Sequence, residues 1–383
     1  MMSRSVAVIA MLAVSGVAAT PFRTVAQDAA PPLPPGAEVV ATGLRNPRGM
    51  VFDAEGTLYI VEAGVGGTEN QIIGPEGAPE GYGNTSGLTM VTGGVATRVV
   101  DDIRGRAHLD GMNAIGLNDI TFGADGTLYG VIGFGGDPAD RAAADDPDQP
   151  QLATLVTIDP ASGAMTTIAD LGAYEQENNP DGGAIDTNPY AIITLPDGDL
   201  LVADAGANDL LRVTPAGEIS TVAVFPDTEV TAPDGSSMMP MNAVPDAVAL
   251  GLDGAISVGQ LTGVPFPVGG ATVFTVPAAG GAPTAAETGF TNIIDLGWNV
   301  DGSLWVLEFM HGGMLAANPA DPATMEGRLV RIAPDGTRTD VAGSNLFVPT
   351  NFAFGPEGDV YVTVNAVIGN QGMVIRIPLA VEQ

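Results

Sequence analysis

The chain has 383 residues and a formal net charge of −32, with 45 acidic residues against 13 basic ones. It contains no Cys and no Lys, so every basic residue is Arg. Disulfides, thiol nucleophiles, Schiff-base lysines and Walker-type phosphate lysines are therefore excluded. His108 and His311 are the only imidazoles, and no Gly-x-Ser-x-Gly motif accompanies them. Chemistry would have to use carboxylates, amides or a hard cation, and the acidic surface disfavours nucleic acids and anionic membranes as partners.

The first 26 residues have the pattern of a secretory signal peptide. Arg4 gives a positive start, residues 6–19 form an apolar run, and Thr24-Val25-Ala26 provides a small-residue cleavage site. Cleavage after Ala19 is the alternative. Residues 27–36 contain two Pro-Pro pairs, which is typical of an extended leader. We therefore expect a secreted or periplasmic monomer that keeps no membrane contact once the leader is removed.

A repeated turn and strand organise the rest of the chain. An acidic residue followed by Gly stands between two apolar strands six times, with 48 to 72 residues between successive glycines. This spacing suits one four-stranded propeller blade per repeat. Gly accepts the positive φ that a tight hairpin turn requires. The six glycines are Gly56, Gly126, Gly198, Gly254, Gly302 and Gly358.

The two ends of the repeat array complement each other. The last repeat finishes at residues 373–378 without room for its outer strand, whereas residues 37–42 form a strand that no repeat uses. Pairing the two would complete the sixth blade and remove an open sheet edge, with Val39 and Val40 adding apolar burial. We predict an all-β, six-bladed β-propeller over residues 37–383, closed by this N-terminal strand. The only helix candidate is the short segment 141–144.

The connections fall into two classes that a propeller places on opposite faces. The hairpin turns are short throughout, and the other connections hold nearly all of the extra length. The long loops should therefore gather on one face, where a rigid scaffold usually presents its binding residues. Tyr82, Phe134 and Tyr174 lie in these loops, and together with Phe266 they would either form the floor of a pocket or anchor the loops. The long connections are 63–86, 101–116, 133–151, 171–187, 225–243 and 310–327.

Alignment on the turn glycine predicts two sets of polar residues around the central channel. The first, at the channel mouth, comprises Arg48, Asn118, Asp119, Tyr190, Asp246, Asp295 and Asn351. The second comprises Glu62, Asp204, Gln260 and Glu308. Such residues either cap backbone groups and tie blades together or, as a ring of oxygens, hold Ca²⁺, which takes 6–8 oxygen ligands.

For the second set we favour the structural role. The calcium hypothesis concerns Asn118, Asp119, Asp246, Asp295 and Asn351. Residues 178–186 form another oxygen-rich segment, although ordinary turns have the same composition.

Several motifs resemble the ScyD/ScyE family, propellers named after products of the scytonemin pigment gene cluster. They are Asn46-Pro47-Arg48-Gly49-Met50, Tyr59-Ile60-Val61-Glu62-Ala63-Gly64 and the segments 178–190, 261–269 and 288–296. The resemblance spans nearly the whole mature chain and implies a propeller related to the NHL type, which residues 201–209 also suggest. The chain departs from the family where Gln260 replaces Glu and where Asn118-Asp119 replaces His-Asp. The family brings no settled activity to these residues.

Two functions remain open at this point. The first is a non-enzymatic binding or scaffold module whose loop-rich face takes a small molecule or a protein. The alternative is a calcium-dependent lactonase or hydrolase with its metal at the channel mouth and with Asp119 or His108 as general base. This alternative rests on analogy with six-bladed lactonases. Calcium is the only cofactor that the sequence suggests.

Overall fold

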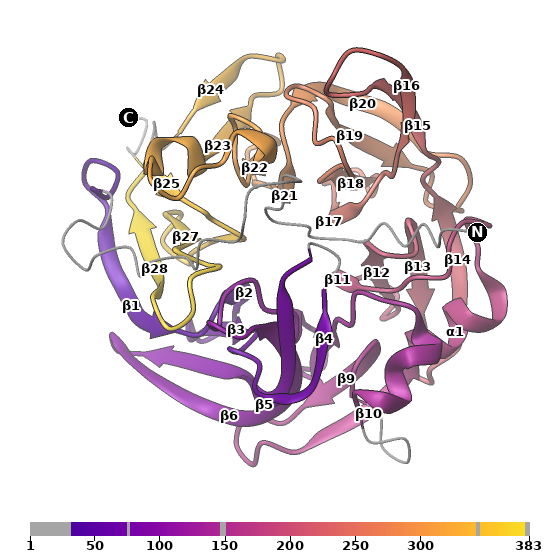
Figure 1. Cartoon of the computed structure of the whole chain (residues 1–383). Coiled ribbons are helices and arrows are strands. Elements are labelled where there is room, and N and C mark those ends of the chain that lie inside the picture. The colour runs from indigo at the N-terminus through magenta and orange to yellow at the C-terminus, as the bar shows by residue number, and fades with distance from the viewer. Residues whose placement is uncertain (1–31, 75–76, 146–150, 342–344, 380–383) are drawn as a thin grey trace.

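The computed structural model describes residues 32–74, 77–145, 151–341 and 345–379. It confirms the predicted six-bladed β-propeller, in which six antiparallel four-stranded blades surround a central axis (Figure 1). The predicted signal peptide, residues 1–26, and the first part of the leader lie outside the described residues.

The blades follow one another in chain order, each with its innermost strand first. Blade 1 consists of β2 (Pro47–Phe52), β3 (Leu58–Glu62), β5 (Pro79–Thr92) and β6 (Val95–His108). Blade 2 consists of β7 (Leu117–Phe122), β8 (Leu128–Ile132), β9 (Thr154–Ile158) and β10 (Met165–Asp170). Blade 3 consists of β11 (Pro189–Thr194), β12 (Leu200–Asp204), β13 (Asp209–Val213) and β14 (Ile219–Val224). Blades 4 and 5 are β17 (Pro245–Leu250), β18 (Ile256–Gln260), β19 (Ala271–Val276) and β20 (Thr284–Phe290), and β21 (Ile293–Trp298), β22 (Leu304–Glu308), β23 (Glu326–Ile332) and β24 (Arg338–Asp340). Blade 6 joins β26 (Phe352–Phe354), β27 (Val360–Val364) and β28 (Gly372–Ile377) to β1 (Glu38–Leu44).

The second strand is buried along its whole length in five of the six blades. β3, β8, β12, β18 and β22 are buried at every position. Strands covered on both faces need continuous apolar sequence rather than alternation, which is the pattern in the repeats. Aromatic contacts join neighbouring blades, as between Tyr59 and Phe122, whose ring centroids lie 5.4 Å apart at 78°.

The ring closes through the pairing of β1 with β28, from Glu38 opposite Arg376 to Leu44 opposite Gly372. The burial expected of Val39 and Val40 is wrong, because Val39 is 52% exposed and Val40 is only half-buried. Two shifts of register in this pairing change the face that each residue presents, since one extra residue moves a side chain to the other side of a strand. Ala41 and Leu44 are the residues that enter the core.

Parts of the long connections are more regular than the sequence suggests. β5 and β6 are 14 residues each and run on beyond blade 1 as a projecting hairpin, to which β4 (Glu69–Ile73) adds a strand. Residues 63–86 and 101–116 are therefore not simple loops. β15 (Thr228–Thr231) and β16 (Met238–Met241) form a second hairpin, and β25 (Leu346–Phe347) pairs with β23.

The structure also contains one α-helix that the sequence did not predict. Helix α1 (Leu171–Asn178) begins at Asp170, whose carboxylate accepts a hydrogen bond from the Ala173 N–H, and ends at Asn179 in the left-handed conformation. The helix lacks an amphipathic stripe, so its sequence has no periodic apolar pattern that would predict a helix. The short predicted helix at 141–144 is part of a 3₁₀ turn, η1 (Pro138–Ala143), and two more follow as η2 (Met314–Ala316) and η3 (Pro322–Met325).

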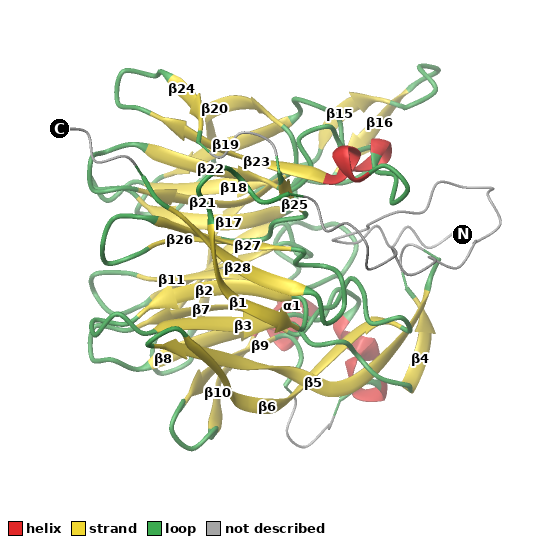
Figure 2. Ribbon diagram, turned by 90° about the vertical axis from the view of Figure 1, so that its left-hand side faces the viewer, coloured by secondary structure: helices red, strands yellow, loops and turns green. Residues whose placement is uncertain are grey.

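The two faces of the propeller differ as the loop lengths predict. Figure 2 shows α1, the 3₁₀ turns, β4 and the β15–β16 hairpin on one side, with the short hairpin turns on the opposite side. We call the first side the loop-rich face. In the described residues, no helix has the length and apolar character needed to cross a membrane.

The closure can be tested with a pair of alanine substitutions in β1. Leu44→Ala should destabilise the protein by about 2–5 kcal/mol, because Leu44 is buried against Met50, Leu58 and Val374. Val39→Ala, in the same strand but exposed, should stay within about 0.5 kcal/mol of the wild type. Urea unfolding of both variants measures the difference, and equal losses would contradict the register described here.

Candidate functional site

Three of the predicted channel residues each tie their own blade to the following one. In each case a side-chain oxygen accepts a hydrogen bond from a backbone N–H in the innermost strand of the following blade. The pairs are Asp119 with the Ile192 N–H at 2.9 Å, Asp295 with the Phe352 N–H at 2.9 Å, and Asn351 with the Met50 N–H at 3.1 Å. In blade 1, Gly49 occupies the position in the repeat that Asp119, Asp295 and Asn351 occupy in their own blades. A Cβ there would lie 1.9 Å from Asp119 Oδ1, so the close approach of blade 2 excludes a side chain.

Arg48, Tyr190 and Asp246 form a buried polar group near the channel axis. The Arg48 guanidinium donates to the backbone oxygens of Ala366 at 2.6 Å and Ala114 at 2.8 Å. Asp246 is only 1% exposed, and neither of its oxygens accepts a hydrogen bond. Burial raises the pKa of Asp246 well above its usual range, and the positive charge of Arg48 opposes that shift. Burial also raises the pKa of the Tyr190 phenol, and Arg48 again acts in the opposite direction.

These contacts bear directly on the calcium hypothesis. The oxygens of Asp119, Asp295 and Asn351 already accept backbone hydrogen bonds, and the Asn118 amide donates to the Pro189 carbonyl at 2.9 Å. Asp246 has free oxygens, but it faces the guanidinium of Arg48. Within the described ranges, no three His, Asp or Glu side chains gather to hold a metal ion. A calcium site at this ring therefore stays a prediction that the geometry does not support.

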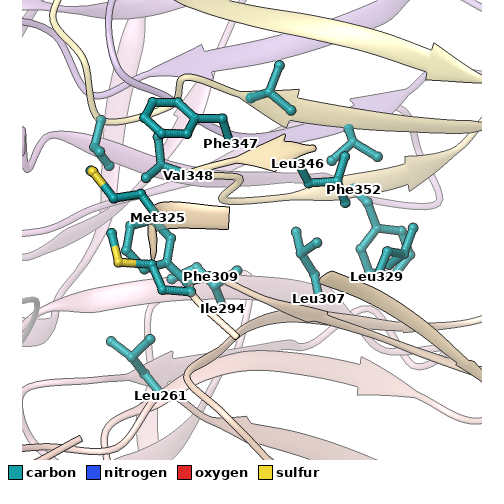
Figure 3. Close-up of a cluster of buried hydrophobic side chains, with 14 of the residues drawn as sticks. Leu261, Ile294, Leu307, Phe309, Met325, Leu329, Leu346, Phe347, Val348 and Phe352 are labelled. Atoms are coloured by element: carbon teal, nitrogen blue, oxygen red, sulfur yellow. The ribbon is translucent and has the colours of Figure 1, made fainter. Parts of the chain in front are cut away.

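The channel group is also covered by apolar side chains. Tyr190 belongs to one buried cluster with Leu261, Ile294, Phe309 and Val348. Figure 3 shows the last four of these side chains close together. Arg48 and Tyr190 are 2% and 5% exposed. Arg48 and Tyr190 therefore lie inside the protein rather than at an open mouth, whereas Asp119, Asp295 and Asn351 are partly exposed.

The residues of the second predicted set make contacts within their own blades. The carboxylates of Glu62, Asp204 and Glu308 each accept a backbone N–H from the segment that leads into the innermost strand. Those donors are Arg45, Asn188 and Thr291, at 2.6 Å in each case. Glu62 also pairs with Arg98, and Glu308 with Arg328. Gln260 is likewise buried.

An open pocket lies on the loop-rich face over blades 1 to 3, and we call it the crown pocket. Its volume is about 480 Å³. Strand β4, the η1 turn and residues 184–186 form its walls, so four of the predicted long connections meet here. Its apolar lining includes Ile72, Ile73, Phe134 and Ile185, and its polar lining includes Tyr82, Arg106, Asp137, Asp140 and Asp186.

A buried arginine fixes one wall of the crown pocket. Arg106 Nε lies 3.1 Å from Glu80 Oε2, and its Nη2 donates to the Gly135 carbonyl at 2.7 Å. His108 Nε2 lies 3.8 Å from the other oxygen of Glu80. Because Glu80 compensates the charge of Arg106, this wall offers a rigid hydrogen-bonding surface rather than a free cation.

Asp186 is the polar group of the pocket with the most unusual surroundings. It is 7% exposed, and its Oδ1 has no hydrogen-bond partner. Burial raises its pKa to about 7, Asp204 adds to that rise, and Arg106 opposes it. A carboxyl with an unused oxygen at a pocket wall is well placed to bind a donor on a ligand.

The aromatic and imidazole residues of the long loops have different positions. Tyr82 and Phe134 line the crown pocket. Tyr174 instead contacts Thr221 through its hydroxyl, Phe266 packs in the apolar cluster, and His311 Nδ1 contacts the Glu326 carbonyl oxygen at 2.8 Å. Sequence reasoning missed Arg106, Asp137 and Asp140. The one available signal was that 101–116 and 133–151 were both long connections.

Comparisons with known proteins support the fold. No protein-family model matches the chain, and a search of curated proteins found no match. Among solved structures, a gluconolactonase from Xanthomonas campestris is similar with a TM-score of 0.50 at 12% identity, over 89% of each chain. A protein of unknown function from Bacteroides thetaiotaomicron has a TM-score of 0.53 at 10% identity, over 89% of this chain and 74% of that one. A virginiamycin B lyase from Staphylococcus aureus has a TM-score of 0.46 at 14% identity, over 90% and 89%.

The fold and its neighbours define the class of protein. The chain is a six-bladed β-propeller, and its structural neighbours are six-bladed propeller proteins. Identities this low show the fold alone, so the function must be argued from the site.

The ties between blades can be tested at Asp295. Asp295→Ala should destabilise the protein by about 1–3 kcal/mol, because the N–H groups of Phe352 and Leu296 lose their acceptor. Asp295→Asn should lose less than Asp295→Ala, since its single amide oxygen can replace one of the two acceptor atoms, as Asn351 Oδ1 does in blade 6. Thermal midpoints of the two variants give the comparison. An equal loss in both would show that the charge, and not the hydrogen bond, matters.

Proposed function

We propose that this protein is a binding propeller that holds a small molecule in the crown pocket. The supporting observation is the pocket itself, about 480 Å³ on the loop-rich face with apolar walls and a few fixed polar groups. This volume and lining are typical of small-molecule sites. The channel residues, by contrast, are engaged in contacts between blades, and four of them are also buried: Arg48, Asn118, Tyr190 and Asp246.

The lining favours a neutral or cationic ligand with an apolar body. Asp137, Asp140 and Asp186 contribute carboxyl groups, whereas the one cation, Arg106, is paired with Glu80. The net charge of −32 also repels anions at long range. Ile72, Ile73 and Phe134 would pack against the apolar part of such a ligand.

The alternative function is a calcium-dependent lactonase acting at the channel mouth. The gluconolactonase from Xanthomonas campestris shares the fold, but at 12% identity that likeness does not extend to activity. Oxygens of Asp119, Asp295 and Asn351 there already accept hydrogen bonds, and the free oxygens of Asp246 lie near the positive charge of Arg48. A screen of lactones and esters with and without Ca²⁺ tests this alternative directly.

Family and location belong to the same proposal. The motifs at 46–50, 178–190 and 261–269 support membership of the ScyD/ScyE family. The N-terminal pattern supports export, and the exported chain should begin near Gln27. Mass spectrometry of the exported protein tests this, and a chain that still carries Met1 would contradict it.

The crown pocket can be tested with two probes of opposite charge. 4-Phenylbutylamine and 4-phenylbutyrate have similar apolar bodies and differ in their charged group. We expect saturation-transfer NMR to detect the amine bound to the protein and to show little binding of the carboxylate. Preference for the carboxylate, or binding of neither, would overturn the proposed ligand class.

A pair of tryptophan substitutions locates the binding. Ala184→Trp places a large side chain at the wall of the crown pocket and should abolish the amine signal. Ala286→Trp is the matched control, because Ala286 is also exposed but lines a groove of about 490 Å³ between blades 4 and 5 beside the short turns. It should leave the signal unchanged. Loss of binding in both variants, or in neither, would place the site elsewhere.

A further inference from the structure

Blade 3 holds a group of carboxylates outside the crown pocket that the proposed function does not use. Asp204 ends β12 and Asp209 begins β13, and the two residues are directly opposite in the antiparallel pairing. Glu175 approaches from α1, and its carboxylate interacts electrostatically with Asp204 and Asp181. We call Glu175, Asp181, Asp204 and Asp209 the blade-3 acidic group. It lies beside the oxygen-rich segment 178–186.

Two members of this group are fully used by contacts within the protein. Asp204 accepts hydrogen bonds from the Thr187 hydroxyl and from the backbone N–H groups of Asn188, Gly206 and Ala207. Asp181 lies at the edge, where it accepts from the Gly183 N–H at 2.7 Å and the Asn208 amide at 3.2 Å. Burial raises the pKa of Asp204, and its hydrogen-bond donors act in the opposite direction.

The other two members are buried and lack well-formed hydrogen bonds. Glu175 is 2% exposed and Asp209 is 1% exposed, and none of their four carboxylate oxygens accepts a hydrogen bond of good geometry. Burial raises the pKa of Glu175 to about 8, with a further rise from Asp204, while the nearby Asp186 N–H only partly offsets it. Burial raises the pKa of Asp209 well above its usual range, and Asp204, Glu175 and Asp181 add to the effect. No ion pair from an Arg side chain reaches this group in the described residues.

Protonation alone does not satisfy these two side chains. A protonated carboxyl is a hydrogen-bond donor and needs an acceptor when it is buried. Neither Glu175 nor Asp209 has such a partner, and they do not bond to each other. A cation between them would instead compensate both charges and use their free oxygens. The Oδ1 atom of Asn179, which directly follows α1, is also buried without a partner.

We propose that Glu175 and Asp209 bind a calcium ion between α1 and the start of β13. Calcium is favoured because it takes carboxylate, amide, carbonyl and water oxygens in flexible geometry. Since no three acidic or imidazole side chains in the described ranges gather as a complete metal site, the remaining ligands would be neutral oxygens. This site is separate from the channel residues and does not depend on the ligand of the crown pocket.

Calorimetry on the full-length protein, freed of metal with EDTA and titrated with CaCl₂, tests this inference. We expect one calcium ion bound per chain and a rise in the thermal midpoint, because an ion that binds only the folded state stabilises it. The same titration with MgCl₂ should give weaker binding, since Mg²⁺ demands stricter geometry. No binding, or only weak binding at many surface carboxylates, would overturn the proposal without any variant being made.

Substitutions then place the ion. Glu175→Gln and Asp209→Asn should each abolish the calcium heat and the midpoint rise, and their positions on different elements guard against a folding defect in one of them. Glu177→Gln is the matched control, because Glu177 lies on the same helix but is exposed. Asp295→Asn is the control for a channel site. Both controls should bind calcium as the wild type does. Calcium binding retained in Glu175→Gln and Asp209→Asn, or lost in Asp295→Asn, would show that the ion does not lie here.

Discussion

The structure depends on the closure of one ring of six similar blades. A blade cannot bury both faces of its strands alone, so each one needs a neighbour on either side. The pairing of β1 with β28 supplies the last contact, and it joins residues more than 300 positions apart in the chain. Without disulfides, this pairing and the packing between blades must hold the ring together.

The polar residues near the axis serve the same requirement. Asp119 and Asp295 reach across to backbone N–H groups of the following blade, and Asn351 does so where blade 6 meets blade 1. Burial of such carboxylates raises their pKa, to about 7 for Asp119, although they are structural ties. A perturbed pKa at the axis of this propeller is therefore no sign of catalysis by itself.

A rigid ring leaves the loop-rich face free to vary. The projecting hairpin of β5 and β6, the η1 turn and the loop after α1 come from three different blades, yet they meet around the crown pocket. The blade-3 acidic group involves the same loop, because Asp181 lies in it and Glu175 interacts electrostatically with both Asp181 and Asp186. The two sites thus share a segment while differing in chemistry, one apolar with isolated polar groups and the other made of carboxylates.

The sequence alone determined the repeat, the number of blades, the closing strand and the face that carries the long connections. These features follow from local signals, since turn glycines and apolar strands recur at blade spacing regardless of what surrounds them. The sequence also favoured a structural role for the second polar set, which includes Glu62 and Glu308. The sequence could place the channel residues at the same level along the propeller axis. It could not show which of their side-chain oxygens would accept hydrogen bonds from the next blade.

Only the tertiary structure decided which side chains meet. Because of the register shifts in β1, Leu44 rather than Val39 packs in the core. Helix α1 forms although its sequence has no periodic apolar pattern that would predict it. Arg106 and Asp186 come together across 80 residues of sequence, and Glu175 on α1 interacts electrostatically with Asp209 at the start of β13. Such contacts depend on how loops of different blades fold over one another. No spacing within a single repeat encodes them, because each loop's path is set by packing against its neighbours.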